Sequence, residues 1–152
     1  MSYLVTEHRE PPHHLVAVRF EATPAEIPER IGGALAEVFG YLGRHGVTPA
    51  GPPVGHYEMV GPEHFVVRAG CFVPEPVATE DGVVGHELPA RRELRTEHVG
   101  SYADLPRAYD ALQKYAAEHG RELDLGEMWE EYVSGPEVPP TYRRTIVHWP
   151  LA

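Results

Sequence analysis

TPAEIP at residues 23–28 returns as SYADLP at residues 101–106, 78 positions further along the chain. Each hexapeptide places a hydroxyl residue three positions before a carboxylate, a pattern that caps a helix N-terminus by accepting hydrogen bonds from free backbone N–H groups. The proline that ends each copy suits a first helical turn, because proline has no N–H to leave unpaired. The two hexapeptides therefore predict two related helices. Each begins either at its capped residue or at its proline, with the capped residues then forming a separate turn.

Apolar stripes follow both hexapeptides and end at matching signals. Their spacing of three and four residues predicts one apolar face on each helix. Both stripes stop at a His-Gly pair, at residues 45–46 and 119–120, where glycine can adopt the left-handed backbone conformation. The second helix is shorter by about one turn, which explains why the offset falls to 74. The stripes consist of Ile27, Ile31, Leu35, Val38, Phe39 and Leu42, and of Leu105, Tyr109, Leu112, Tyr115 and Ala116.

The correspondence continues beyond the helices, which indicates a duplicated unit. Tyr57 followed by Gly-Pro at residues 61–62 parallels Tyr132 followed by Gly-Pro at residues 135–136. FVP at residues 72–74 likewise parallels HWP at residues 148–150. Each half reads strand, helix, strand, strand. The predicted strands cover residues 15–20, 54–60 and 65–73 in the first half and 92–99, 128–133 and 143–149 in the second.

These elements predict one α+β domain over residues 1–152, built from two β-α-β-β units with pseudo-two-fold symmetry and antiparallel sheets. We place the first repeat at about 1–74, a linker rich in Pro, Gly and acidic residues at about 75–85, and the second repeat at about 86–152. One helix covers only one face of so small a sheet. The other face is therefore expected to meet its twin, and the two main helices to enclose a central cleft along the seam, where a ligand would bind.

Composition excludes several classes of protein. A chain of 152 residues with 42% hydrophobic content fits one domain, and its net charge of −10, with no basic run, argues against direct nucleic-acid binding. The chain has no apolar run near the roughly 18 residues of a membrane span, and its start lacks the features of a signal peptide. We expect a cytoplasmic protein without membrane contact. The single cysteine, Cys71, is expected to be a small buried strand residue.

Histidines are numerous, ten in all, and invite a metal hypothesis. His8, His13 and His14 gather near the start, but the chain has neither an H-E-x-x-H pattern nor the Cys and His spacing of a zinc module. The sequence therefore predicts no metal site and no cofactor. His86, His98 and His148 are expected on strand surfaces.

Three stretches of the chain resemble the GyrI-like small-molecule-binding domain family. They are GPPVGHY at residues 51–57, the helix cap before Leu105-Pro106, and WEEYVSGP at residues 129–136. The family also supplies effector-binding domains of AraC-type and MerR-type multidrug regulators. The resemblance spans nearly the whole chain and implies the duplicated fold and a site for amphipathic, often cationic aromatic compounds between the halves. It also implies that a glutamate two residues before the late tyrosine points into the pocket, and this position is Glu130.

Glu130 and Glu131 are neighbours on a predicted strand, and the alternation of side chains bears on which of them faces the cleft. Side chains alternate along a strand, so Glu130 and Glu131 point to opposite faces, and alternation alone does not decide which one enters the cleft. The position matching Glu130 in the first half is Gly55, so one half supplies a carboxylate and the other supplies room. A carboxylate among aromatic rings has a raised pKa or awaits a cationic partner. The expected ligand-binding residues are Glu130, Tyr132, Tyr57, Trp129, Trp149 and Gly55.

Two main classes of function remain open. The favoured one is a sensor, carrier or drug-sequestering protein for a hydrophobic or cationic small molecule. The two repeats fill the chain and leave no room for a helix-turn-helix, so a role in transcription would need a separate DNA-binding partner. The alternative, implied by the resemblance, is a hydrolase of electrophilic aromatic toxins that uses Glu130 as general base with Tyr57 or Tyr132 placing the substrate. A further alternative is a protein that inhibits a topoisomerase by direct contact. The natural ligand and the oligomeric state stay open.

Overall fold

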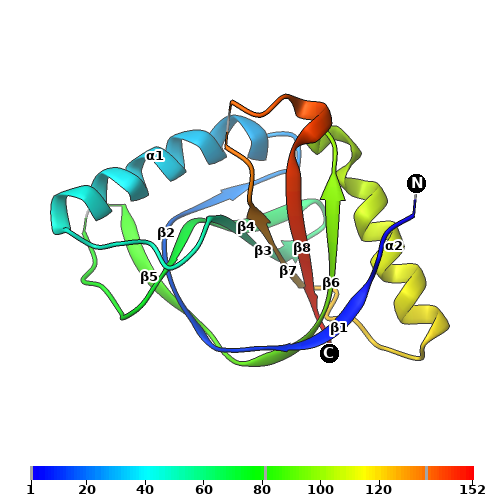
Figure 1. Cartoon of the computed structure of the whole chain (residues 1–152). Coiled ribbons are helices and arrows are strands. Elements are labelled where there is room, and N and C mark those ends of the chain that lie inside the picture. Colours follow the sequence, from blue (N-terminus) through cyan, green and yellow to red (C-terminus); the bar gives the residue numbers. More distant parts are fainter. Residues whose placement is uncertain (1, 81, 136) are drawn as a thin grey trace.

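Two strand-helix-strand-strand units follow one another along the chain, and each is preceded by one additional strand (Figure 1). The structure, a computed structural model, describes residues 2–80, 82–135 and 137–152. Met1, Asp81 in the expected linker and Pro136 in the matched Gly-Pro pair lie outside the described residues. The duplicated α+β fold is confirmed. The elements are β1 (Thr6–Glu10), β2 (His13–Ala22), α1 (Ile27–His45), β3 (Pro53–Gly61), β4 (His64–Val73), β5 (Val83–Leu88), β6 (Arg91–Val99), η1 (Tyr102–Asp104), α2 (Leu105–Glu118), β7 (Glu127–Tyr132), η2 (Pro140–Tyr142) and β8 (Arg144–Pro150).

Both long helices begin one residue before their proline, and the capped residues form separate turns. The backbone N–H and the hydroxyl of Thr23 donate to the carboxylate of Glu26, each at 2.9 Å, in the turn before α1. The matching residues of the second half form the short 3₁₀ helix η1. Gly46 ends α1 in the left-handed conformation, with φ of 63°. At the start of each helix, the hydroxyl–carboxylate pattern therefore forms a short turn and the helix itself begins directly after it.

The two halves join edge to edge in one sheet of eight antiparallel strands, in the order β1-β6-β8-β7-β3-β4-β2-β5. This corrects the expectation that the halves meet face to face. Pairing β3 with β7 satisfies backbone groups that two free sheet edges would leave without partners. Gly55 lies directly opposite Glu130 in this pair, and the same two positions correspond in the repeat. The pseudo-two-fold axis therefore passes between Gly55 and Glu130.

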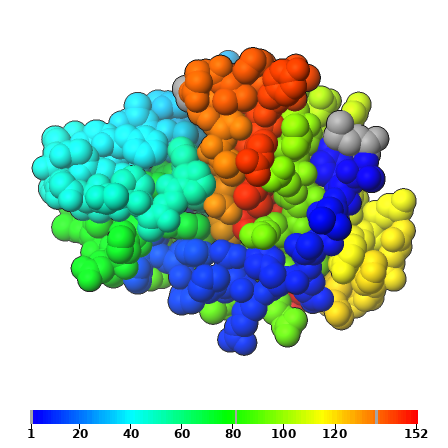
Figure 2. Space-filling model, in the orientation of Figure 1, coloured from blue at the N-terminus to red at the C-terminus, as the bar shows by residue number. Residues whose placement is uncertain are grey.

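The additional strands β1 and β5 were missed by the sequence reading, and each pairs with the other half. β1 pairs with β6, and β5 pairs with β2. The register is shared, from Thr6 opposite Arg95 to His13 opposite Leu88, so the four strands form one long ribbon interrupted at its prolines. In Figures 1 and 2 the dark-blue N-terminal segment lies against the green strand β6 of the second half. The expected linker overlaps this ribbon, because β5 begins at Val83.

Each helix covers its own half of the sheet. Val38, Tyr41 and Leu42 of α1 pack against a cluster from β2 and β4 that includes the fully buried Cys71. Ala108, Leu112 and Ala116 of α2 pack against β6 and β8. Among the described residues, no helix is both long and apolar enough to cross a membrane. The central strands β3 and β7 lie between the areas that α1 and α2 cover. Because α1 packs mainly on β2 and β4, and α2 mainly on β6 and β8, space for a cavity remains above these strands.

Candidate functional site

A cavity of about 810 Å³ lies between the two helices and above the central strands. This volume falls within the range of pockets that enclose drug-sized molecules. Most of the lining is apolar or aromatic. It includes Ile27, Ile31 and Leu35 from α1, Leu105 and Tyr109 from the start of α2, and Met128 from β7. The charged residues in the described lining are Glu130 and Arg143.

Glu130 and three tyrosines form a hydrogen-bonded group in this cavity. Glu130 is 7% exposed, and its two carboxylate oxygens accept bonds from the hydroxyls of Tyr109 at 2.5 Å and Tyr132 at 2.8 Å. Because Tyr132 gives its proton to Glu130, its oxygen is free to accept a bond from the hydroxyl of Tyr57. The group thus draws on α2, β7 and β3 and crosses the boundary between the two repeats.

Burial sets the proton affinities of this group. Burial raises the pKa of Glu130 above its ordinary value, although the tyrosine hydrogen bonds partly oppose this shift. Burial, and next the charge of Glu130, raise the pKa values of Tyr57, Tyr109 and Tyr132 well above normal, so the tyrosines remain protonated donors. Within the described part of the chain, no Lys, Arg or His nitrogen lies within ion-pair distance of the Glu130 carboxylate. Among the described residues, the direct side-chain contacts of its charge are tyrosine hydroxyls, and His98 acts on it only from a longer distance.

Gly55 supplies the space that the tyrosines occupy. A Cβ at this position would lie 2.5 Å from the hydroxyl oxygens of both Tyr57 and Tyr132, well inside contact distance. Gly55 is not part of the cavity lining but lies beneath the two rings. One repeat therefore has glycine where the other has glutamate. This difference leaves room for a single carboxylate at the pseudo-two-fold axis, with tyrosines from both halves around it.

The two tryptophans expected in the cleft do not line the cavity, which corrects that expectation. Alternation along β7 turns Met128, Glu130 and Tyr132 to the cavity and Trp129 to the opposite face, where its ring stacks on His148 with centroids 3.6 Å apart. Trp149 does lie on the helix side, but it is buried beneath α2. Its ring packs behind Tyr109 with centroids 5.6 Å apart. The choice that periodicity left open is settled in favour of Glu130 as the inward glutamate.

Tyr109, Tyr102 and Arg143 belong to the cavity but were not expected there. Tyr109 is visible in the sequence as a member of an apolar helical stripe, and a hydroxyl in such a stripe needs a buried partner. Tyr102 is 43% exposed and the guanidinium of Arg143 lies 5.2 Å from its ring centroid, so these two form the open edge of the cavity. Neither residue carries a sequence signal that points to this role.

The strand histidines also differ from expectation. His98 and His148 are 2% and 0% exposed rather than on the surface, and His86 is half-buried. The Nε2–H of His98 donates to the backbone carbonyl of Ser101 at 2.9 Å, and its Nδ1 accepts a hydrogen bond from the Tyr3 hydroxyl at 2.8 Å. Both its nitrogens are thereby satisfied. His8 of the missed strand β1 lies against His148, with ring centroids 5.9 Å apart, and Tyr3, just before β1, stacks on His98 at 5.9 Å.

The family model described as the GyrI-like small molecule binding domain matches residues 5–152. The chain belongs to this family. Comparison with curated protein sequences gives no match. The GyrI-like chain is similar to the crystal structure of the EcmrR C-terminal domain, with 17% identity and a TM-score of 0.84 over 100% of this chain and 99% of that one. It spans 57% of the longer EcmrR chain seen in a complex with DNA.

Two further solved structures share the GyrI-like fold at low identity. SAV2435 bound to tetraphenylphosphonium has 11% identity and a TM-score of 0.66, over 100% of this chain and 94% of that chain. A protein described as a hydrolase from Listeria innocua has 13% identity and a TM-score of 0.68, over 99% and 93% of the two chains. At such identities the likeness concerns the fold.

Proposed function

We propose that this GyrI-like domain binds an amphipathic, cationic aromatic compound in the cavity between α1 and α2, with the carboxylate of Glu130 as its counter-charge. The observation that carries the proposal is a buried carboxylate, without an ion-pair partner among the described residues, in a cavity with a mainly apolar lining. A ligand that is large, apolar and positively charged matches both properties. The class of ligand follows from the lining, and its charge follows from Glu130.

The energetics of the carboxylate favour a cationic ligand. Removing an ionised carboxylate from water costs several kcal/mol when no opposite charge accompanies it. Three tyrosine hydroxyls offset part of this cost, and a bound cation would remove more of it. The faces of nearby aromatic rings would add about 0.5–2 kcal/mol of cation–π attraction. Arg143, the other charged residue of the described lining, lies over the Tyr102 ring at the exposed edge and forms no ion pair with Glu130.

Sensing, carrying or sequestering such a compound are the roles that we propose for this binding. The similar SAV2435 structure holds tetraphenylphosphonium, a lipophilic aromatic cation, which supports the proposed ligand class. The EcmrR structures show a domain of this fold within a longer chain that forms a DNA complex. A role in transcription would therefore place the DNA contact outside the cavity-bearing domain.

A pair of nearly isosteric ions tests the proposal directly. Tetraphenylphosphonium and tetraphenylborate have similar size and apolar surface but opposite charge. We expect the wild-type protein to bind the cation more tightly by more than about thirtyfold, since a desolvated charge pair contributes about 2 kcal/mol or more. Isothermal titration calorimetry of both ions measures the ratio. Equal affinities, or tighter binding of the anion, would contradict a negative cavity.

The affinity for the cation should also depend on pH. A raised folded-state pKa means that the unliganded cavity holds the Glu130 proton more tightly than the unfolded chain does, so the stability of the unliganded protein falls as pH rises through that pKa. A cation favours the ionised form, and tetraphenylphosphonium itself does not titrate. Its affinity should therefore rise as pH increases from the ordinary carboxyl pKa through the raised one, which calorimetry across the pH range where the protein stays folded would follow. A flat profile would remove Glu130 ionisation from binding.

Hydrolysis of an electrophilic aromatic compound is a second candidate. It is favoured by a carboxyl group of raised pKa next to three hydroxyl donors, which resembles a general base with groups that orient a substrate. Against it, both carboxylate oxygens are engaged by tyrosines. Mass spectrometry of the protein incubated with neutral aromatic epoxides would reveal the addition of water. If turnover occurs, Glu130→Gln should abolish it while binding of the neutral compound persists.

A further inference from the structure

Four potential metal ligands converge on the face of the sheet opposite the cavity. They are His8 and Glu10 from β1, Glu93 from β6 and His148 from β8, and their ligand atoms all lie within 4.8 Å of one another. His8 Nε2 lies 2.7 Å from a Glu10 oxygen and 3.8 Å from a Glu93 oxygen, and that Glu93 oxygen lies 3.0 Å from His148 Nδ1. Three strands from two repeats thus bring four donor atoms to one point.

We infer that these four residues form a binding site for a divalent transition metal ion, with zinc as the best fit. Zinc takes imidazole nitrogen and carboxylate oxygen at about 2.0–2.1 Å in a tetrahedral arrangement, which separates neighbouring ligand atoms by roughly 3.3 Å. Three of the six separations are 2.7, 3.0 and 3.8 Å, on both sides of this value, and all six are at most 4.8 Å. Shifts of up to about one ångström, which the partly buried side chains of His8 and Glu10 can make by rotation, would complete the geometry.

The surroundings of the cluster have the pattern of a metal site. Ligating histidines and carboxylates are usually held by hydrogen bonds through the atom that does not bind the metal. Three of the four residues have such a partner on that second atom. The bonds are His148 Nε2 with Glu131 at 2.6 Å, Glu93 Oε2 with the Trp129 indole N–H at 2.6 Å, and Glu10 Oε1 with His13 Nε2 at 2.7 Å.

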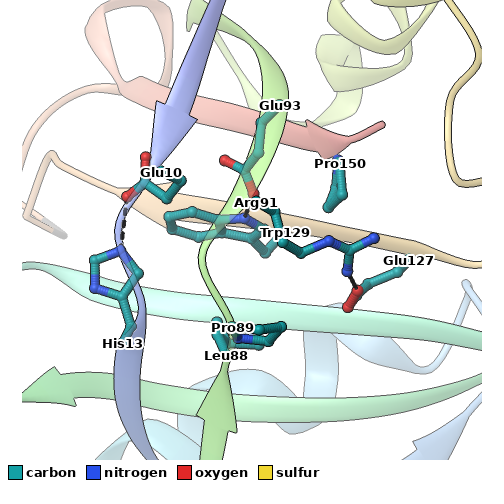
Figure 3. A pocket seen from close by; sticks show the side chains of 9 residues that line it. All are labelled: Glu10, His13, Leu88, Pro89, Arg91, Glu93, Glu127, Trp129 and Pro150. Atoms are coloured by element: carbon teal, nitrogen blue, oxygen red, sulfur yellow. Dashed lines mark hydrogen bonds and ion pairs between the residues drawn. The ribbon is translucent and has the colours of Figure 1, made fainter. Parts of the chain in front are cut away.

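The negative charge around the cluster and the depression that two of its residues line also favour a bound metal ion. Glu10, Glu93 and Glu131 bring three carboxylates around the two imidazoles, and Glu93 and His148 are almost fully buried. A depression of about 10 Å³, close to the size of one water molecule, is lined by two of the four residues, Glu10 and Glu93, which Figure 3 shows. Arg91 also lines it, but its guanidinium pairs with Glu127 and with Asp124 at 3.0 Å. A dication would offset two of the three negative charges of Glu10, Glu93 and Glu131.

The proposed site has a structural character. Four protein ligands complete a tetrahedral zinc shell and leave no open position for a substrate. The metal would link β1 of the first half to β6 and β8 of the second half. It would thereby stabilise the pairing of β1 with the other half. It lies apart from the cavity and is independent of the proposed small-molecule binding.

Direct metal titration tests the inference on the unmodified protein. The full chain without an affinity tag, stripped with a chelator, should bind one equivalent of Zn²⁺ in calorimetry. It should give the intense visible absorption of tetrahedral Co²⁺ when cobalt is used instead. Its melting temperature should rise with Zn²⁺. No saturable binding of one equivalent, or a cobalt spectrum of octahedral type, would overturn the site.

Variants separate this site from chance binding by surface histidines. His8→Gln and Glu10→Gln alter the two less buried ligands of the cluster and should each weaken Zn²⁺ binding by more than about 100-fold. The loss of one supporting hydrogen bond alone would cost less. The control is His14→Gln, because His14 is more exposed and pairs at 2.6 Å with Glu87 outside the cluster. It should leave the affinity unchanged. An equal loss in the control, in protein that melts normally without metal, would overturn the proposal. Tetraphenylphosphonium binding should be unaffected in all three variants.

Discussion

Replacing Glu130 with glutamine is expected to weaken the binding of tetraphenylphosphonium by more than about thirtyfold, the equivalent of about 2 kcal/mol or more. Glutamine keeps the size of the side chain and one oxygen for the tyrosine hydroxyls, but it removes the charge from the cavity. The cation would then leave water for a mostly apolar site without a counter-charge. Calorimetric titration of wild-type and variant protein at a pH where Glu130 is ionised gives the ratio.

Two controls make this result specific to charge and position. Glu131→Gln changes the neighbouring residue, which points to the other face of the sheet, and should alter the affinity for the cation by less than about twofold. Triphenylphosphine oxide, a neutral aromatic compound, should bind wild-type and Glu130→Gln protein with similar affinity. Equal losses for the neutral and the charged compound would mean that Glu130 shapes the cavity and does not act as a counter-charge.

Replacing Gly70 with alanine is expected to destabilise the fold by on the order of 3 kcal/mol or more, because the added methyl group has no space. Its Cβ would lie 1.8 Å from the backbone oxygen of Val16 and 2.8 Å from the Cα of Ala17, the residue opposite on β2. These are backbone atoms in a central strand pair, so no side-chain rotation relieves the overlap. Urea denaturation followed by circular dichroism measures the change in the free energy of unfolding.

Gly85 provides the matched control, since it pairs with the same strand from its other edge, opposite Val16. The nearest atom to a Cβ at Gly85 is the backbone oxygen of Val77 at 3.9 Å, an ordinary contact distance. Gly85→Ala should therefore change the free energy of unfolding by less than about 1 kcal/mol, within the usual range for glycine and alanine in a strand. Comparable losses at Gly70 and Gly85 would show that close approach of the backbone is not what requires glycine at Gly70.

The amino-acid sequence by itself determined the duplication, the two helices to within about one turn at each end, and the correspondence of Gly55 with Glu130 in the repeat. These features depend on signals that act over a few residues: a hydroxyl before a carboxylate, an apolar stripe, a glycine after a histidine. Comparison of the two repeats added information that no single segment of the sequence contains. It showed that Tyr57 and Tyr132 occupy equivalent places and that only one half carries the carboxylate.

Only the tertiary structure decided how the halves meet and which faces become sites. Edge pairing of β3 with β7 placed both helices beside one cavity, turned Trp129 away from it and brought Tyr109 to Glu130. Exchange of β1 buried His148 and assembled the proposed metal ligands. The physical reason is the same in each case. Strand pairing and its register join residues far apart in the chain, and a strand's own alternation does not say which partner strand or which face it will meet.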